Sequence, residues 1–226
     1  KPAAAFGGEP AQPVVPDILM RRMSDGSFAV ELNPDTLPRV LVNNRYYAQI
    51  APGAQDKEAR SFVNENLQSA NWLVRALDQR ANTILRVAGE IVRQQDMFFR
   101  HGVSYLRPMT LREIAEAIGM HESTVSRVTA NKFIASPRGI FELKYFFSTA
   151  IAGADGTSSH AAEAVRHRIK TLIDSESPDA VLSDERLVSL LKREGIDVAR
   201  RTVAKYRESM KIPSSSRRKR EKALQA

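Results

Sequence analysis

Two segments of the chain place hydroxyl and guanidinium groups on one face of an expected helix, which is chemistry suited to reading DNA. In the first segment, Val125 and Val128 are spaced to point inward, and a rotation of about 100° per residue leaves a polar face opposite them. The candidate DNA-binding residues of this segment are Ser123, Thr124, Ser126 and Arg127. A guanidinium such as that of Arg127 can make two parallel hydrogen bonds to guanine in the major groove, and hydroxyls can bind bases or phosphates.

The second segment, residues 199–210, is a basic helix by the same criterion. Its apolar stripe consists of Ala199, Val203, Tyr206 and Met210. Arg201 lies at the centre of the opposite face, where it could read a guanine, and the cations beside it suit phosphates. The candidate DNA-binding residues here are Arg200, Arg201, Thr202, Lys205 and Arg207. An exposed basic helix without a ligand is the alternative, but a leucine-bearing helix upstream, at helix-turn-helix distance, favours DNA.

The first segment also has the elements of a helix-turn-helix. Thr110 and Glu113 have capping-box spacing, which specifies the start of a helix. Ala115 is small enough for a second helix to cross closely, and Gly119 allows the positive φ of a tight turn. The second helix of such a unit enters the major groove. A helical hairpin that only packs is the alternative reading of this spacing.

The residues before this unit predict a small sheet and a helical hairpin. Residues 1–16 are rich in Pro, Ala and Gly and predict an unfolded lead-in. Strands are expected at residues 26–32 and 40–42, with a third at 17–22. Residues 56–100 have helical periodicity with an interruption at 78–82 (DQRAN). Two long helices joined there are expected to pack as a hairpin, whose function would be a protein contact.

The residues after the unit predict a linker and a small helical domain. Residues 151–159 are small and polar and predict a flexible linker. Helices are expected at residues 161–173, 184–193 and 199–210. Residues 214–226 are a basic tail with nothing apolar to anchor it. The expected fold is mainly α: a helical domain with a small β element at 17–107, a helix-turn-helix domain at 108–150, and a C-terminal three-helix, helix-turn-helix-like domain at 160–213.

The charge of the chain is concentrated at its C-terminal end. The 226 residues include 34 Lys and Arg against 26 Asp and Glu, a net charge of +8. Residues 160–226 contain 16 basic and 10 acidic side chains, which is +6 of that total. A concentration of this kind indicates a polyanion partner, and a solubilising surface is the alternative.

The composition excludes several kinds of chemistry. The sequence has no Cys, which excludes disulfides, thiolate metal sites and cysteine nucleophiles. No apolar run approaches the roughly 20 residues that span a bilayer. His160, Glu163 and His167 have the spacing of metal ligands, but there is no obvious fourth ligand, so no metal and no cofactor are expected.

Two rival functions fit parts of the pattern. Tyr206, beside Arg200 and Arg201, would suit a tyrosine recombinase, but it belongs to the apolar stripe and is expected to be a packed ring. A transcriptional repressor with a ligand-binding or dimerisation domain at residues 17–100 would bind a palindromic site as a homodimer.

Residues 199–208 (ARRTVAKYRE) resemble, without a departure, the ten-residue signature box of the sigma-54 family of bacterial transcription initiation factors. Residues 120–148 resemble the helix-turn-helix of that family and the segment that follows it. The stretches VELNPDTLPRV and NLQSANWLVRALDQRANTILRV resemble the part of the family that binds core RNA polymerase. Together the resemblance extends over almost everything after residue 14.

This resemblance implies a non-catalytic specificity subunit that binds core RNA polymerase and directs it to a bipartite promoter in double-stranded DNA. It assigns the helix-turn-helix around Arg127 to the minus-twelve element. It assigns Arg200, Arg201 and Lys205 to the GG-containing minus-twenty-four element. Residues 17–107 would form part of the domain that binds core polymerase, and the protein is expected to be a monomer in the bacterial cytoplasm, associated with the nucleoid.

In the same family, an ATP-hydrolysing activator acts on a glutamine- and leucine-rich N-terminal region to open the DNA. Residues 1–16 match neither that region nor the acidic stretch that follows it. The chain is therefore expected to be a C-terminal fragment without the region that the activator contacts.

Overall fold

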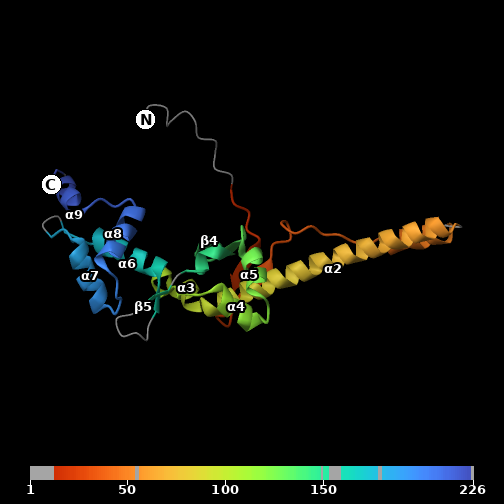
Figure 1. The fold of residues 1–226 in the computed structure, drawn as a ribbon, viewed down its shortest axis with the longest axis horizontal. Coiled ribbons are helices and arrows are strands. Elements are labelled where there is room, and N and C mark those ends of the chain that lie inside the picture. Colours follow the sequence, from red (N-terminus) through yellow and green to blue (C-terminus); the bar gives the residue numbers. More distant parts are fainter. Residues whose placement is uncertain (1–12, 54–55, 149, 153–158, 178–179, 225–226) are drawn as a thin grey trace, which may run out of the picture. The chain divides into compact units, whose positions relative to one another are not determined.

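A computed structural model of the chain describes residues 13–53, 56–148, 150–152, 159–177 and 180–224. Most of the expected lead-in at residues 1–16 lies outside these ranges. Helices dominate the described elements (Figure 1), which confirms the expected mainly α fold with a small β element. None of the described helices is long and apolar enough to cross a membrane. The chain divides into two compact units, Lys1–Gly89 with Val128–Glu142, and Glu90–Arg127 with Leu143–Ala226.

The first unit contains a four-stranded sheet made from two distant segments of the chain. Strands β1 (Ile18–Arg22) and β2 (Phe28–Leu32) pair antiparallel, as do β3 (Phe133–Ser136) and β4 (Gly139–Glu142). β1 pairs parallel with β3, Ile18 opposite Ile134, and the strand order is β2-β1-β3-β4. The strands expected at residues 17–22 and 26–32 are thus confirmed, whereas their pairing with β3 was not predicted.

Asp17 stabilises the parallel pairing of β1 with β3. Its carboxylate accepts the Phe133 N–H at 3.0 Å and lies 3.1 Å from the Lys132 ammonium. Its own N–H donates to the Phe133 carbonyl at 2.9 Å. These bonds satisfy backbone groups at the end of the strand pair, where a sheet otherwise leaves them open to water.

The strand expected at residues 40–42 is wrong. The segment has no regular structure, and Leu41 is 93% exposed. A strand is stable when a neighbour satisfies its backbone groups, and none of the described strands pairs with this segment. The apolar side chains of residues 40–42 are therefore not sufficient to form a strand.

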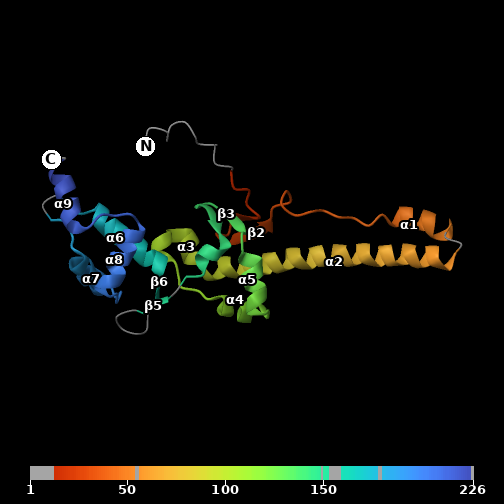
Figure 2. The same cartoon turned by 45° about the horizontal axis from the view of Figure 1, so that its top comes forward.

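A short helix lies beside a very long one in this unit. Helix α1 (Asn44–Ile50), followed by the 3-10 turn η1 (Ala51–Gly53), precedes α2 (Lys57–Gln94), which continues into the second unit. The 38 residues of α2 correspond to about 57 Å at 1.5 Å per residue. The Tyr47 hydroxyl donates to Asn64 Oδ1 at 3.0 Å and holds α1 alongside α2 (Figure 2).

The expected joint at residues 78–82 is also wrong, because α2 runs through it unbroken. The segment contains no Pro or Gly to end a helix. Its polar residues are exposed, while Ala81 is half-buried and continues the inward stripe from Leu77 to the buried Ile84. The polar residues 78–82 therefore lie on the solvent-exposed side of one continuous helix. The expected two-helix hairpin is absent from the described residues.

The second unit includes an aromatic core next to the helix-turn-helix. Helix α3 (Asp96–His101), the 3-10 turn η2 (Val103–Tyr105) and the 3-10 turn η3 (Leu143–Phe146) surround it. The Phe146 ring centroid lies 5.3 Å from that of Phe98 and 5.4 Å from that of Phe99. The buried Gln95 amide accepts the Arg107 N–H at 3.1 Å and donates to the Arg107 carbonyl at 2.8 Å. This amide pair fixes the segment that leads into α4 (Leu111–Ile118) and α5 (Glu122–Thr129).

The flexible linker expected at residues 151–159 is wrong at both of its ends. Strands β5 (Ala150–Ala152) and β6 (Ser159–Ala161) pair antiparallel, with Ile151 opposite His160. Residues 153–158, the middle of the expected linker, lie outside the described residues. Backbone pairing between the two ends is a tertiary feature that small, polar composition does not indicate.

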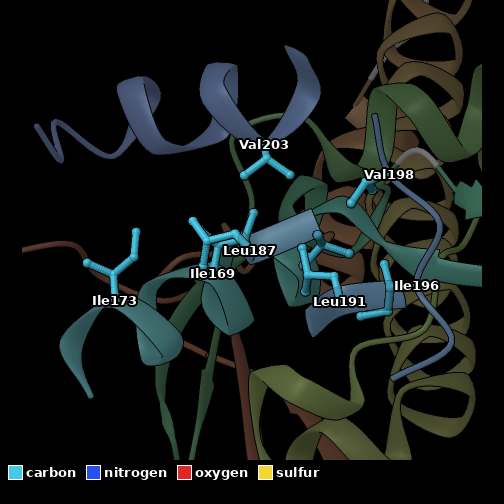
Figure 3. Close-up of a cluster of buried hydrophobic side chains, with 8 residues drawn as sticks. Ile169, Ile173, Leu187, Leu191, Ile196, Val198 and Val203 are labelled. Atoms are coloured by element: carbon cyan, nitrogen blue, oxygen red, sulfur yellow. The ribbon is translucent and has the colours of Figure 1, made fainter. Parts of the chain in front are cut away.

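Three helices follow where they were expected: α6 (Ala162–Asp174), α7 (Asp184–Arg193) and α8 (Arg200–Ser209). They enclose an aliphatic cluster (Figure 3) that consists of Val165, Ile169, Ile173, Leu187, Leu191, Ile196, Val198 and Val203. An ion pair between Arg168 and Glu194, with Nε 2.7 Å from the carboxylate, joins α6 to the C-terminal end of α7. Burial of each large aliphatic side chain contributes roughly 1.5–3 kcal/mol, so this cluster is the main apolar core of the domain.

The C-terminal segment forms helix α9 (Ser215–Ala223), so the expectation of an unanchored basic tail is wrong. Its anchor is polar. Arg218 is 5% exposed and donates to the fully buried Glu176 carboxylate at 2.8 and 3.0 Å. The Lys222 ammonium lies 3.3 Å from the same carboxylate. A buried ion pair, which no apolar count detects, therefore holds this helix to the domain.

Acid is expected to release α9. Burial alone would raise the pKa of Glu176, but Arg218, the Leu182 N–H and Lys222 hold that pKa below the ordinary value of 4.5. A lowered folded-state pKa stabilises the native state above the unfolded-state pKa, and this stabilisation is lost as the pH falls through the folded-state value. Urea unfolding from about pH 6 to pH 3 should show this loss in the wild type and a smaller one in Glu176→Gln. Equal acid sensitivity of the two proteins would contradict the expectation.

Candidate nucleic-acid interface

The first helix-turn-helix has the local geometry that its sequence predicts. The Thr110 hydroxyl accepts the Glu113 N–H at 3.2 Å, and the Glu113 carboxylate accepts the Thr110 N–H at 2.7 Å, which confirms the capping box. Gly119 ends α4 with a φ of 64°, and the Met120 N–H donates back to the Ala115 carbonyl at 2.9 Å. The left-handed turn, which favours glycine, sets the angle at which the chain enters α5.

Helix α5 presents its polar residues outward. Val125 is fully buried and Val128 is half-buried. The exposed residues of the opposite face include Ser123, Ser126 and Arg127, and Thr124 is half-buried at its margin. The His121 ring accepts the Ser123 N–H at 3.2 Å and so caps the first turn of the helix. The expected orientation of α5 is therefore present, with an arginine and two serines on its accessible side.

Helices α7 and α8 form a second helix-turn-helix. The Ser183 hydroxyl accepts the Arg186 N–H at 3.2 Å, so the expected N-cap of α7 is confirmed. The connection turns at Gly195, which has a φ of 82°, and buries Ile196 and Val198. Ala199 is the exposed N-cap of α8. It therefore does not belong to the buried stripe, which begins at Val203.

The outward side of α8 carries cations. Arg201 and Lys205, one helical turn apart, are both exposed. The ion pairs of α8 with other described residues involve neither of them. Arg200 lies 3.4 Å from the Glu185 carboxylate, with side chains 68% and 73% exposed. Such a surface pair is weak, so Arg200 can exchange its partner for a phosphate. Thr202 is only half-exposed.

Arg207 has to be removed from the candidate DNA-binding residues. Its side chain is 6% exposed and donates to the Asp184 carboxylate at 3.0 and 3.3 Å. A further bond runs from its guanidinium to the Ile212 carbonyl at 2.8 Å. Because its donors are used inside the domain, Arg207 positions α8 on α7 and is not available to phosphates.

The sequence contained a signal for this role. Arg207 follows the buried Val203 by four residues, so both lie on the same face of the helix. An arginine on an inward face needs a carboxylate partner, and Asp184, in the first turn of α7, supplies it. The helical phase expected from the sequence placed Arg207 on a flank of the exposed face, whereas the structure buries it beside Val203.

Tyr206 is a packed ring. It is half-buried against the aliphatic cluster, and the Arg166 guanidinium lies 5.0 Å from its ring centroid. Both contacts use the face and body of the ring, as expected for a residue of the apolar stripe. Among the described residues, His160, Glu163 and His167 included, no group of His, Asp or Glu side chains is arranged to hold a metal ion.

The fold and this interface define a protein with two different helix-turn-helix units. A family model described as "Sigma-54, DNA binding domain" matches residues 60–220, and one described as "Sigma-54 factor, core binding domain" matches residues 1–46. The chain belongs to the sigma-54 factor family. The border between the two models lies well upstream of residue 107, where the sequence alone placed the end of a core-binding domain.

Similar proteins carry the same family name. The chain is 63% identical over 222 residues to an RNA polymerase sigma-54 factor of Azorhizobium caulinodans, covering 98% of this chain and 43% of the relative. It is 58% identical over 221 residues to that of Caulobacter vibrioides, covering 97% and 44%. The chain thus spans less than half the length of these relatives. These matches do not favour the repressor and recombinase alternatives.

A solved structure shares the fold. The crystal structure of Aquifex aeolicus sigmaN bound to promoter DNA is 29% identical, with a TM-score of 0.61, and the match covers 94% of this chain and 62% of that one.

Replacing Arg207 should mainly lower the stability of the domain, because its side chain does not face DNA. Arg207→Ala leaves the partly buried Asp184 carboxylate, 19% exposed, without its cation. Breaking a fully buried pair from one side costs about 3–5 kcal/mol, so a loss of about 2–3 kcal/mol is expected for this pair. Urea unfolding should show a loss of this order, while Lys205→Ala, on the exposed face of the same helix, should change stability by less than about 0.5 kcal/mol. Equal stability of the two variants would mean that the Arg207 pair does not anchor α8.

Proposed function

We propose that this chain supplies the polymerase-binding and promoter-reading parts of a sigma-54 transcription initiation factor. In this role it binds core RNA polymerase and directs it to a bipartite promoter, and it catalyses no reaction itself. Both family models support the proposal, as does the similar structure, which is bound to promoter DNA.

Helix α8 reads the minus-twenty-four element. The observation that carries this assignment is the pair of exposed cations, Arg201 and Lys205, on a helix whose other side is anchored by Val203 and Arg207. A helix of this width enters the major groove. Arg201 then donates two hydrogen bonds to a guanine of the GG step, while Lys205 and Arg200 neutralise phosphates. Thr202 contributes a hydroxyl at the margin.

Helix α5 reads the minus-twelve element in the same manner. Arg127 is its guanine-binding candidate, and the hydroxyls of Ser123, Thr124 and Ser126 bind base edges or phosphates. The two helix-turn-helix motifs differ in sequence, so the DNA site that they recognise is asymmetric. An asymmetric site sets the direction of transcription and is bound by a monomer, whereas a symmetric dimer requires a palindrome.

The polymerase-binding surface lies in the first unit. Several large apolar side chains of the α1 and α2 region face water, and they include Val40, Leu41, Tyr46, Phe62 and Trp72. Exposed apolar groups gathered on neighbouring segments mark a protein-binding surface. The core-binding family model covers residues 1–46, which supports core RNA polymerase as the partner.

The activator and the cellular location are features of the whole factor. The family resemblance assigns promoter opening to an ATP-dependent activator that acts on an N-terminal region of the factor. Such a factor works in the bacterial cytoplasm on nucleoid DNA. Both features follow from the proposed role.

Footprinting on a promoter with both elements tests this function. The chain should protect the minus-twenty-four element alone and both elements in the presence of core polymerase. A control promoter with a scrambled GG step should lose the protection. A symmetric footprint on a palindrome, unaffected by core polymerase, would instead indicate a repressor.

Two substitutions on α8 separate base reading from phosphate binding. Arg201→Ala should cost about 1–3 kcal/mol on the promoter and relax discrimination at one guanine. Lys205→Ala should weaken binding to all sequences and lower the slope of log K against log salt by about one. Binding titrations on promoter and scrambled duplexes give both quantities. A sequence-independent loss for both variants would rule out base reading by Arg201.

A further inference from the structure

The charges of α9 are divided between the domain interior and the outer surface. The segment 214–226 contains five basic residues and one acidic residue. Arg218 and Lys222 are used by the buried Glu176, and Arg217 pairs with Glu221 at 2.8 Å. Lys219 and Arg220 are exposed, and the ion pairs between α9 and other described residues involve neither of them. Two cations of the helix are therefore available to a partner.

The phase of α9 places Arg220 on its outer side and Lys219 at the edge of that side. Arg218 and Lys222, four residues apart, define the side that faces the domain. At about 100° per residue, Arg220 lies nearly opposite Arg218, and Lys219 lies between them. The outer side therefore carries Ser216, Arg217, Arg220 and Ala223, and Lys219 lies at its edge. A large apolar residue, Leu224, appears only at the C-terminal cap.

An arginine from each helix donates a hydrogen bond to the connection between α8 and α9. Arg207 of α8 donates to the Ile212 carbonyl at 2.8 Å, and Arg218 of α9 donates to the Pro213 carbonyl at 2.7 Å. Arg218 also donates to the Leu182 carbonyl at 2.7 Å. Because Arg207 is itself held by Asp184 and Arg218 by the buried Glu176, α9 has a fixed position relative to the helix proposed to read DNA.

We infer that α9 is a second DNA-binding element of this domain, in which Lys219 and Arg220 bind backbone phosphates beside the site that α8 reads. The inference rests on the proposed function of α8. The chemistry of the outer face favours a polyanion, because protein interfaces are depleted in lysine and have apolar centres, whereas phosphate contacts use Lys and Arg without any sequence requirement. In this role α9 adds affinity and no base specificity.

Salt-dependent binding of the full chain to a promoter duplex tests the inference. For each phosphate that a protein neutralises, the slope of log K against log salt changes by about 0.9. The variant Lys219→Ala/Arg220→Ala should lower the slope by about 1.8, so between 50 and 200 mM salt its affinity should fall about tenfold less than that of the wild type. Its preference for the GG duplex over a scrambled one should be unchanged.

A charge-preserving control separates electrostatics from folding. Lys219→Arg/Arg220→Lys retains both charges and should keep the wild-type slope, since phosphate contacts of this kind depend on charge. Both double variants should unfold at the wild-type urea concentration, because neither changes the Glu176 pair.

The outcomes distinguish the two proposals. A wild-type chain without preference for the GG duplex would overturn the function proposed for α8. If that preference is present but Lys219→Ala/Arg220→Ala has the wild-type slope, the function stands and the inference about α9 is wrong. A loss of core-polymerase binding with an unchanged DNA slope would likewise overturn the inference and assign α9 to a protein surface.

Discussion

The ion pair of the buried Arg207 with the partly buried Asp184 is the interaction on which the C-terminal domain depends. Helix α8 has only Val203 fully buried among its apolar residues, so hydrophobic packing alone fixes its rotation weakly. The guanidinium binds Asp184 on α7 and the Ile212 carbonyl beyond α8. A misrotated helix would leave both charges unpaired, at a cost of several kcal/mol. One ion pair thus determines which cations face outward.

A similar constraint acts in the first unit through the sheet. The Phe133 N–H donates to the side chain of Asp17, a residue 116 positions earlier, and β1 pairs parallel with β3 beside that bond. The segment matched by the core-binding family model is thereby bound to the strand that follows α5. Closing so long a loop costs conformational entropy, which the burial of Ile18 and Ile134, the hydrogen bonds of the sheet and the Asp17 contacts offset.

Charge pairing divides the cations at the basic end of the chain into those held by carboxylates and those that stay exposed. Three carboxylates of the C-terminal domain, Asp184, Glu176 and Glu194, each hold an arginine. Arg201 and Lys205 of α8 and Lys219 and Arg220 of α9 are exposed and take part in none of the ion pairs between described residues of these helices, whereas Arg200 and Arg217 form only exposed surface pairs. Net charge alone would have treated the paired and the unpaired cations as equal, although only unpaired ones raise the potential that attracts a polyanion.

The sequence by itself determined the local features. The capping box of Thr110, the turn at Gly119, the cap at Ser183 and the outward face of α5 all follow from interactions within a few residues, which spacing reveals. The signature box revealed the family. The tertiary structure decided what depends on distant partners: the continuous α2, the β1 and β3 pairing, the paired ends of the expected linker, and the burial of Arg207 and Arg218. These depend on which carboxylate or strand the fold brings near, and no local pattern contains that information.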